Sequence, residues 1–223
     1  MKLTAVIFDM DGVLVNSEPL WRDAMVEAFK EVGLIITREE CAETTGLRID
    51  HVVEYRYEKS PWKLKSKKET VDLILQKLVN LIYEKAEALE GAIDAIHYFR
   101  SNGFKIGLAT SSPSIILNAI LDKLMIRDYF EITNSAENLS FGKPHPEVYI
   151  NTAQELGVAP TACIAIEDSF NGLLSAKAAR MKTIAVPEIE NQKNPKFVIA
   201  DVLLSNLSEL SDKHIEILEN SLT

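Results

Sequence analysis

Short apolar runs that alternate with helical patterns constrain the fold of this chain most strongly. The candidate strands are runs rich in Val, Ile, Leu and Ala at Leu3–Phe8, Phe104–Ala109, Ala162–Ile166 and Thr183–Val186, with weaker candidates at Val202–Leu204 and Phe130–Thr133. Strands of parallel sheets have such continuous runs because both of their faces are buried. Helical patterns lie between them at Ala92–Asn102, Ser114–Leu124, His145–Leu156 and Phe170–Ala179. This order predicts an α/β fold with a doubly wound parallel sheet.

One long segment after the first strand breaks this alternation, because it carries only helical signals. Apolar residues recur at four-residue spacing over Pro19–Val32, and the capping box that begins a helix is matched at Thr37–Glu40 and Ser66–Glu69. An insertion at this point would lie over the carboxyl ends of the strands, where open α/β sheets bind ligands. The predicted division is an α/β core at 1–16 and 86–223 with an all-helical insertion at 17–85.

Composition limits the possible partners. Hydrophobic residues make up 47% of the 223 residues, enough for a substantial core, and the formal net charge is -9 at pH 7. An acidic chain without a basic patch matches neither nucleic acid nor an anionic membrane. The apolar runs all fall short of the roughly 18–20 residues of a membrane span. Cys41 and Cys163 are expected to be reduced thiols, and the N-terminus has no signal-peptide pattern, so we expect a cytoplasmic protein.

Asp9 and Asp11 follow the first apolar run directly, and Gly12 comes next. Two carboxylates at the end of a buried strand repel each other unless a cation or a reaction compensates for their charge. In the functional hypothesis, Asp9 attacks phosphorus and Asp11 acts first as an acid and then as a base. Gly12 would let the backbone turn sharply toward the phosphoryl group. The alternative is a structural pair in a solvated turn, but the flanking strand and glycine favour the functional hypothesis.

Hydroxyl groups and a lysine follow two further runs. Thr110, Ser111 and Ser112 come after the second run, and Ser and Thr both bind phosphate and cap helices. We assign the phosphate contact to Thr110, include Ser111 as a candidate substrate contact, and expect at least one of the two serines to cap the next helix. Lys143 lies in the proline-flanked turn Gly142–Pro146. It is a candidate to neutralise the nucleophile and the phosphoryl group, or else an ordinary surface lysine.

Two more carboxylates, Glu167 and Asp168, end another apolar run. Mg²⁺ prefers carboxylate, carbonyl and water oxygens. We therefore expect Asp9 and Asp168 to bind Mg²⁺ directly, with the backbone carbonyl of Asp11, and Glu167 to bind it directly or through water. The usual preference for acids at helix N-termini would explain Asp168 alone, but it does not explain acids at the ends of two separate strands.

Together these motifs resemble those of the haloacid dehalogenase-like phosphohydrolase superfamily over nearly the whole chain. The matching positions are Asp9–Val13, Thr110, Lys143–Pro144 and Glu167–Asp168. The resemblance implies a Rossmann-like core, an aspartyl-phosphate intermediate, a Mg²⁺ cofactor, and a small helical cap that opens and closes over the site. The dehalogenases of the superfamily lack an acid at the position of Asp11, so they are excluded.

Within the superfamily, the opening Asp9–Leu14 is similar to the β-phosphoglucomutase and sugar-phosphatase subgroup. Other runs most resemble the bacterial hexitol phosphatases, also called 2-deoxyglucose-6-phosphate phosphatases: Asn16–Trp21, Gly46–Asp50 and Ser60–Trp62. Two positions depart from the mutase pattern. Trp21 replaces a mutase histidine that helps to gate the acid, and Arg48 falls one residue earlier than its mutase counterpart. These departures favour net hydrolysis.

Specificity is expected to depend on the cap. Arg48 is a candidate ligand of a phosphate or of sugar hydroxyls, with Trp21 and Glu18 as pocket walls. The alternatives are a surface charge for Arg48 and a position in the core of the cap for Trp21. We expect a monomeric Mg²⁺-dependent phosphatase for small sugar or polyol phosphates, such as 2-deoxyglucose 6-phosphate or hexitol phosphates. The alternatives are a β-phosphoglucomutase, a pyrophosphate- or nucleotide-directed phosphatase, and a non-catalytic binding module.

Overall fold

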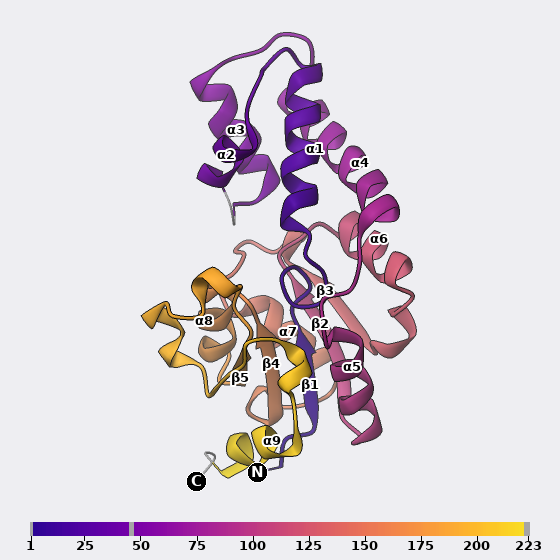
Figure 1. Cartoon of the computed structure of the whole chain (residues 1–223), viewed down its shortest axis with the longest axis vertical. Coiled ribbons are helices and arrows are strands. Elements are labelled where there is room, and N and C mark those ends of the chain that lie inside the picture. Colours follow the sequence, from indigo (N-terminus) through magenta and orange to yellow (C-terminus); the bar gives the residue numbers. More distant parts are fainter. Residues whose placement is uncertain (1, 45–46, 221–223) are drawn as a thin grey trace.

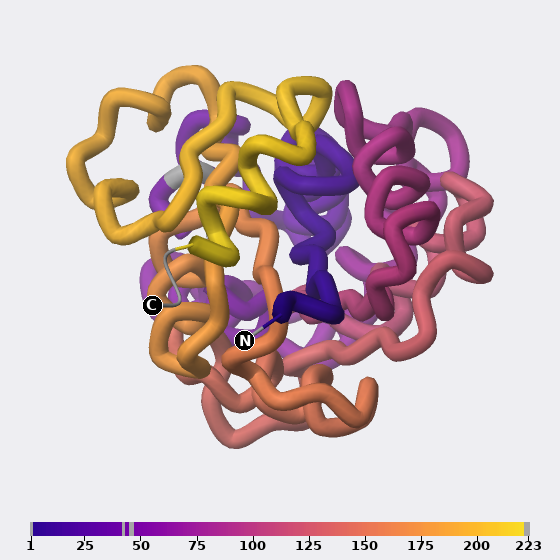
Figure 2. Tube along the Cα trace, turned by 90° about the horizontal axis from the view of Figure 1, so that it is seen from below, coloured from indigo at the N-terminus to yellow at the C-terminus, as the bar shows by residue number. Residues whose placement is uncertain are grey.

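A parallel β-sheet forms the centre of the computed structural model, which describes residues 2–44 and 47–220. Within these residues the sheet has six strands in the order β3-β2-β1-β4-β5-β6. The strands are β1 (Ala5–Phe8), β2 (Lys105–Thr110), β3 (Ile132–Ser135), β4 (Cys163–Glu167), β5 (Lys182–Ala185) and β6 (Val202–Leu203). Figure 2 shows the N-terminal segment in the middle of the molecule, surrounded by later parts of the chain. The predicted α/β fold with a doubly wound parallel sheet is confirmed.

Helices cover both faces of the sheet. They are α5 (Ala92–Ser101), α6 (Ser114–Leu124), α7 (Glu147–Glu155), α8 (Phe170–Ala178) and α9 (Asp212–Asn220). Along β1, Val6 and Phe8 pack into the same hydrophobic cluster as α5 and α6, whereas Ala5 and Ile7 pack into the cluster that contains α7 and α8. Successive side chains of a strand point to opposite faces, so a continuous apolar run is needed to bury both. Among the described helices, none has the length and apolarity that a membrane span requires.

The third strand begins two residues later than predicted. The structure places β3 at Ile132–Ser135 rather than at Phe130–Thr133. Phe130 instead precedes the strand and packs edge-to-face on Phe8, with ring centroids 6.2 Å apart. Because β3 lies at the edge of the sheet and its residues are half-buried, polar residues are tolerated there and the apolar signal is weak.

The helical insertion, residues 18–85, lies beyond the carboxyl ends of the strands (Figure 1). It contains α1 (Glu18–Glu31), α2 (Arg38–Cys41), α3 (Ile49–Lys59) and α4 (Lys67–Lys85). Both predicted capping boxes are present. The hydroxyl of Ser66 accepts from the backbone N–H of Glu69 at the start of α4, and Thr37 and Glu40 make the same reciprocal pair at the start of α2. Because α4 packs against both α1 and α6, the insertion rests directly on the core.

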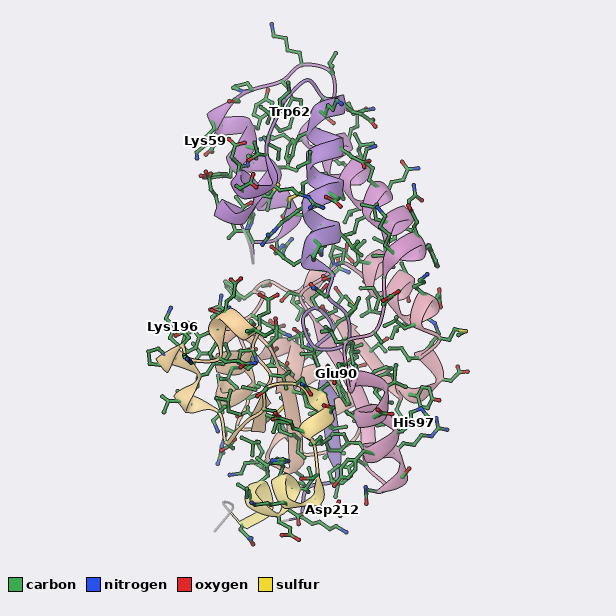
Figure 3. All side chains as sticks on the ribbon, in the orientation of Figure 1. Lys59, Trp62, Glu90, His97, Lys196 and Asp212 are labelled. Atoms are coloured by element: carbon green, nitrogen blue, oxygen red, sulfur yellow. The ribbon has the colours of Figure 1, made fainter. Side chains whose placement is uncertain are left out.

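Trp62 lies in the end of the insertion that is farthest from the sheet (Figure 3). Its ring is buried and makes edge-to-face contacts with Phe29 and Tyr57, at centroid distances of 5.5 and 5.0 Å. Its indole N–H donates to the hydroxyl of Thr70 at 3.2 Å, so the polar end of the ring is also satisfied. Phe29 and Trp62 belong to the same hydrophobic cluster as Phe8 of β1, so the apolar interior runs from the insertion into one face of the sheet.

Candidate active site

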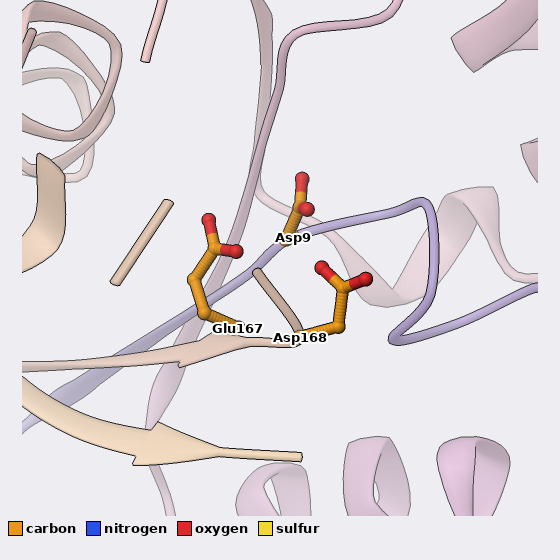
Figure 4. A group of neighbouring side chains, drawn as sticks. All are labelled: Asp9, Glu167 and Asp168. Carbon is orange, nitrogen blue, oxygen red and sulfur yellow. The ribbon is translucent and has the colours of Figure 1, made fainter. Parts of the chain in front are cut away.

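Three carboxylates converge at the ends of two neighbouring strands. Asp9 follows β1, Glu167 ends β4, and Asp168 comes next. The backbone N–H of Asp9 donates to the carbonyl of Ile166 at 2.9 Å, which fixes the two strand ends side by side. One carboxylate oxygen from each of the three acids lies within 4.8 Å of the others, and Figure 4 shows the side chains pointing to the same side of the sheet. We call these three residues the carboxylate cluster.

The three carboxyl groups of the carboxylate cluster face a single cation in the described part of the chain, Lys143, so the cluster has an excess of negative charge. Burial, reinforced by the charge of Glu167, raises the pKa of Asp9 to about 7, although Lys143 opposes this rise. Burial and the charge of Asp9 also raise the pKa of Asp168 well above its usual range. Among the described residues, none donates a well-formed hydrogen bond to Oδ1 of Asp9, which instead pairs with Nζ of Lys143 at 2.8 Å. A hard divalent cation fits this set, because it prefers oxygen ligands and would offset the excess negative charge.

Lys143 is part of this site and not a surface lysine. Its side chain exposes only 6% of its surface, and Nζ lies 2.8 Å from Oδ1 of Asp9 and 2.7 Å from Oε1 of Glu167. The ammonium group also donates to the backbone carbonyl of Ala109 at 2.9 Å. Although burial works against the charged form, the charges of Asp9 and Glu167 raise the pKa of Lys143 above its usual range. Lys143 is therefore a fixed cation at the predicted nucleophile.

Asp11 has different surroundings from Asp9. One of its oxygens accepts a hydrogen bond from Ser17, and the other accepts from Ser112 at 2.7 Å and from Thr110 at 3.3 Å. The Asp11 carboxylate is thus held by hydroxyl groups, outside the carboxylate cluster. The backbone carbonyl of Asp11 remains the predicted metal ligand. This arrangement separates the predicted acid from the predicted nucleophile.

The prediction that Ser111 or Ser112 caps the next helix is wrong. The residue at the N-cap of α6 is Pro113, and the backbone N–H of Ser114 donates to Oε2 of Glu137 at 3.0 Å. Ser112 is buried and points back to Asp11, because β2 lies directly beside β1. Ser111 is exposed. The carboxylate that caps α6 comes from a distant part of the chain, so the local sequence could not reveal it.

Gly12 brings the turn after β1 against Asp168. Its φ is +74°, in the left-handed region that favours glycine. A Cβ at this position would lie 2.0 Å from Oδ2 of Asp168. The glycine predicted to allow a sharp turn therefore also makes room for a member of the carboxylate cluster.

Besides Lys143, a second side chain that contacts the carboxylate cluster is Tyr149, which the sequence does not predict as a site residue. Tyr149 lies on α7, is fully buried, and donates a hydrogen bond of 2.5 Å from its hydroxyl to Oε1 of Glu167. In the sequence it forms part of an apolar helical pattern with Val148 and Ala153, which is typical of a core position. Its position six residues after Lys143 is the only signal in the sequence that connects it with the site.

A cavity of about 160 Å³ lies between the helical insertion and the core. Its lining residues come from both parts: Arg48, Ile49, Asp50, Val71, Leu75, Ser111, Pro113 and Glu137. Arg48 precedes α3, and its guanidinium donates to both oxygens of Asp50 at 3.2 Å. Two of the predicted substrate residues, Arg48 and Ser111, thus line one cavity.

The other two predicted pocket residues do not line this cavity. Trp21 packs, partly buried, against the hydrophobic core, which matches its alternative interpretation. Glu18 pairs with Arg22 on the next turn of α1 at 3.0 Å. Gly46, which belongs to the run that contains Arg48, lies outside the described residues.

Comparisons with known proteins identify the family of this chain. The family described as haloacid dehalogenase-like hydrolase matches residues 3–180. Hexitol phosphatase B of Escherichia coli strain K12 is 43% identical over 215 residues, which cover 96% of this chain and 97% of that protein.

Two solved structures share the fold over almost their whole length. CbbY from Rhodobacter sphaeroides bound to xylulose 1,5-bisphosphate has a TM-score of 0.84 and 26% identity, and the match covers 96% of this chain and 99% of CbbY. β-Phosphoglucomutase from Clostridium difficile has a TM-score of 0.82 and 27% identity, with coverage of 100% and 99%. The chain therefore belongs to the haloacid dehalogenase-like hydrolases, as its four motifs predict.

Proposed function

We propose that this hydrolase is a Mg²⁺-dependent phosphatase that acts on small sugar or polyol monophosphates through an aspartyl-phosphate. The observation that carries the proposal is the contrast between the two aspartates. Asp9 is buried beside the ammonium group of Lys143, whereas Asp11 is held apart by hydroxyl groups. A nucleophile beside a fixed cation and a separate carboxyl for proton transfer are what phosphoryl transfer to an aspartate requires.

In the first step, a carboxylate oxygen of Asp9 forms a bond to phosphorus while the bond from phosphorus to the sugar oxygen breaks. Asp11 gives a proton to that oxygen, which leaves as an alcohol. In the second step, Asp11 takes a proton from a water molecule that attacks phosphorus. Inorganic phosphate leaves and the Asp9 carboxylate is restored. Lys143 offsets the negative charge of the phosphoryl oxygens, and the hydroxyl of Thr110 is the proposed phosphate contact.

The proposed metal ligands are Asp9, Asp168, the backbone carbonyl of Asp11, and Glu167 directly or through water. A Mg²⁺ ion bound by these groups would supply positive charge close to the phosphoryl oxygens. The excess negative charge of the carboxylate cluster supports this assignment, as does Oδ1 of Asp9, which is buried and has an ion pair with Lys143 but no well-formed hydrogen bond from the described residues. Removal of Mg²⁺ with EDTA should abolish phosphate release, and its return should restore it.

The cavity between insertion and core supports a monophosphate with a neutral, hydroxylated remainder. Asp50 already pairs with the one lining arginine, Arg48, and Glu137 adds a further negative charge. A second phosphate would meet this acidic wall, whereas sugar hydroxyls can donate hydrogen bonds to it. The 43% identical hexitol phosphatase B supports the same substrate class. We propose that the insertion, 17–85, acts as the cap of this pocket.

The alternative within the same fold is a β-phosphoglucomutase, which the structural similarity to the Clostridium difficile enzyme keeps open. Analysis of the products from β-glucose 1-phosphate separates the two activities. Release of glucose and inorganic phosphate supports the phosphatase. Formation of glucose 6-phosphate in the presence of a bisphosphate activator would contradict it.

The direct test is Asp9→Asn, which keeps the shape of the side chain and removes the nucleophile. We expect no phosphate release from mannitol 1-phosphate or 2-deoxyglucose 6-phosphate with Mg²⁺ present. Asp128→Asn makes the same change at an exposed position and should retain wild-type activity. Wild-type turnover by Asp9→Asn would refute the mechanism.

We also propose that the enzyme acts as a monomer in the cytoplasm. Cys41 and Cys163 are both free and buried, which suits a reducing compartment. Sedimentation analysis at micromolar concentration should give a single species of 24.9 kDa. A species of twice that mass would contradict the monomer.

A further inference from the structure

Lys143 and Tyr149 contact the same oxygen of Glu167. Nζ of Lys143 lies 2.7 Å from Oε1, and the hydroxyl of Tyr149 lies 2.5 Å from it. The two donors also contact each other: Nζ is 3.4 Å from the Tyr149 hydroxyl and 4.9 Å from the centre of its ring. Tyr149 therefore contacts both the cation beside Asp9 and a member of the carboxylate cluster.

Glu167 is also confined on its other side. A Cβ at Gly172, in α8, would lie 2.0 Å from both carboxylate oxygens, so the glycine provides the space that the carboxylate occupies. Oε2 has a longer hydrogen bond, 3.3 Å from the hydroxyl of Ser169. The two strong donors thus hold Oε1, and Oε2 is the less firmly held oxygen of this carboxylate.

The ring of Tyr149 lies among apolar side chains, whereas its hydroxyl reaches Glu167 and Lys143. Tyr149 packs into the hydrophobic cluster that contains Val148 and Ala153, where phenylalanine would fill nearly the same space. A buried hydroxyl is costly unless it forms a hydrogen bond, and its bond to the Glu167 carboxylate is short.

We propose that Tyr149 is a positioning residue for the Mg²⁺ site. Its hydroxyl fixes the orientation of the Glu167 carboxylate through Oε1, and its ring keeps Lys143 turned toward Asp9. This inference rests on the proposed function only in assuming that the carboxylate cluster binds Mg²⁺. Groups that orient metal ligands without touching the metal typically change metal affinity by about 10- to 100-fold when they are removed.

The test compares two tyrosine-to-phenylalanine variants by their Mg²⁺ dissociation constants, measured calorimetrically on the full-length protein without substrate. Tyr149→Phe removes the hydrogen bond to Glu167 and should weaken Mg²⁺ binding by about 10-fold or more. Tyr98→Phe is the matched control, because Tyr98 also donates to a carboxylate, Asp212, at 2.6 Å, and Asp212 lies at the end of the core away from the insertion (Figure 3). Its Mg²⁺ affinity should equal that of the wild type.

A purely structural hydroxyl would give a different result. In that case Tyr149→Phe should have a lower free energy of unfolding than the wild type, but a Mg²⁺ dissociation constant within twofold of the wild-type value. That result would overturn the inference. If Tyr149→Phe does not fold, Tyr149→Met removes the hydroxyl with a side chain that adapts to the same space, and the same comparison applies.

Two further measurements show whether Tyr149 acts through Glu167. In a double-mutant cycle, Tyr149→Phe should weaken Mg²⁺ binding much less in a Glu167→Gln background than in the wild type, whereas additive effects would overturn the inference. In the phosphatase assay, Tyr149→Phe should need a higher Mg²⁺ concentration than the wild type for its half-maximal rate. At saturating Mg²⁺ it should reach most of the wild-type kcat.

Different measurements refute the role of Tyr149 and the proposed phosphatase activity. Normal Mg²⁺ binding by the wild type with no effect of Tyr149→Phe overturns only the inference. Weakened binding in the variant, with no turnover of sugar phosphates by the wild type, supports the inference and refutes the proposed function. A wild-type protein that binds no Mg²⁺ would refute both the inference and the metal assignment.

Discussion

The hydroxyl of Ser112 donates a hydrogen bond of 2.7 Å to Oδ2 of Asp11, across 101 residues of sequence. This contact, with those from Ser17 and Thr110, holds the Asp11 carboxylate away from the carboxylate cluster. Two aspartates that are almost adjacent in sequence therefore have opposite surroundings. Asp9 faces a fixed cation and other carboxylates, whereas Asp11 accepts hydrogen bonds from neutral hydroxyl groups.

This division predicts that Asp11→Asn acts on the two chemical steps differently. With p-nitrophenyl phosphate, whose leaving group needs little protonation, the variant should release about one equivalent of nitrophenolate rapidly and then slow down as the aspartyl-phosphate accumulates. With a hexitol phosphate, the first step itself should slow by about 10²- to 10⁴-fold, so no burst should appear. Rapid-mixing kinetics measure both. Bursts of equal size with the two substrates would contradict the assignment of Asp11 as the acid.

Glu137 should control discrimination against bisphosphates. Glu137→Gln removes a charge from the cavity wall but keeps an oxygen that can accept from the N–H of Ser114. We expect the ratio of kcat/KM for hexose 1,6-bisphosphate to that for hexose 6-phosphate to rise about 3- to 10-fold, as expected for one partly screened charge at a few ångströms. Glu131→Gln, at an exposed position before β3, should leave the ratio unchanged. An unchanged ratio in Glu137→Gln would mean that the cavity does not receive the far end of the substrate.

Gly12→Ala should damage both stability and metal binding. The left-handed backbone costs about 1–2 kcal/mol for a residue with a Cβ, and the new methyl group would lie 2.0 Å from Oδ2 of Asp168. Urea unfolding should therefore show a loss of more than about 1 kcal/mol, and calorimetry should show weaker Mg²⁺ binding. Gly142→Ala is the control, because, its two chain neighbours aside, none of the described residues has an atom within 4 Å of a Cβ at Gly142. A variant at Gly12 with wild-type metal affinity would show that Asp168 adjusts freely.

Asp201 should stabilise the fold in a pH-dependent way. Its Oδ2 accepts from Nζ of Lys177 at 2.8 Å and from the backbone N–H of Thr183 at 2.8 Å. Although burial works against the charged form, these donors lower the pKa of Asp201 below 3.8. Because the folded-state pKa is lowered, the stabilisation is complete above the unfolded-state pKa and is lost as the pH falls through the folded-state value.

Asp201→Asn tests this directly. At pH 7 the variant should lose about 1–3 kcal/mol of unfolding free energy, the usual cost of a buried group left without its partner. The difference from the wild type should narrow as the pH falls below 3.8 toward the lower folded-state pKa, because the unfolded aspartate then binds a proton that the folded one does not. Urea unfolding at several pH values provides the measurement, and a difference that stays constant down to pH 3 would exclude the carboxylate as its source.

The three acids of the carboxylate cluster could be predicted from the sequence because they end a strand or directly follow one. The carboxyl ends of parallel strands share one edge of the sheet, so the acids after β1 and β4 had to lie together. The capping boxes of α2 and α4 were equally local signals and are present as predicted. Each of these features depends on residues only a few positions apart, or on the single assumption of a parallel sheet.

The contacts that the sequence did not reveal depend on which elements pack together. Ser112 had the local pattern of a helix cap, but the adjacency of β1 and β2 turns it toward Asp11. Tyr149 had the pattern of a core residue, and only the packing of α7 on the sheet brings its hydroxyl to Glu167. Helix α9 carries two buried apolar residues, Ile215 and Leu218, in a polar segment, so its sequence gave a weak signal.

The central place of β1 also determines when the protein can assemble during synthesis. Its four buried residues pair with β2 and β4, which are made about 100 and 160 residues later. At about 5–20 residues per second, the first strand waits for at least about 5 s before either neighbour leaves the ribosome. Helices α1 and α3 of the insertion pack on α4, and all three are made before β2, so these contacts can form in that interval. A nascent chain can therefore begin to fold its insertion well before Asp9 has the neighbours that would make it reactive.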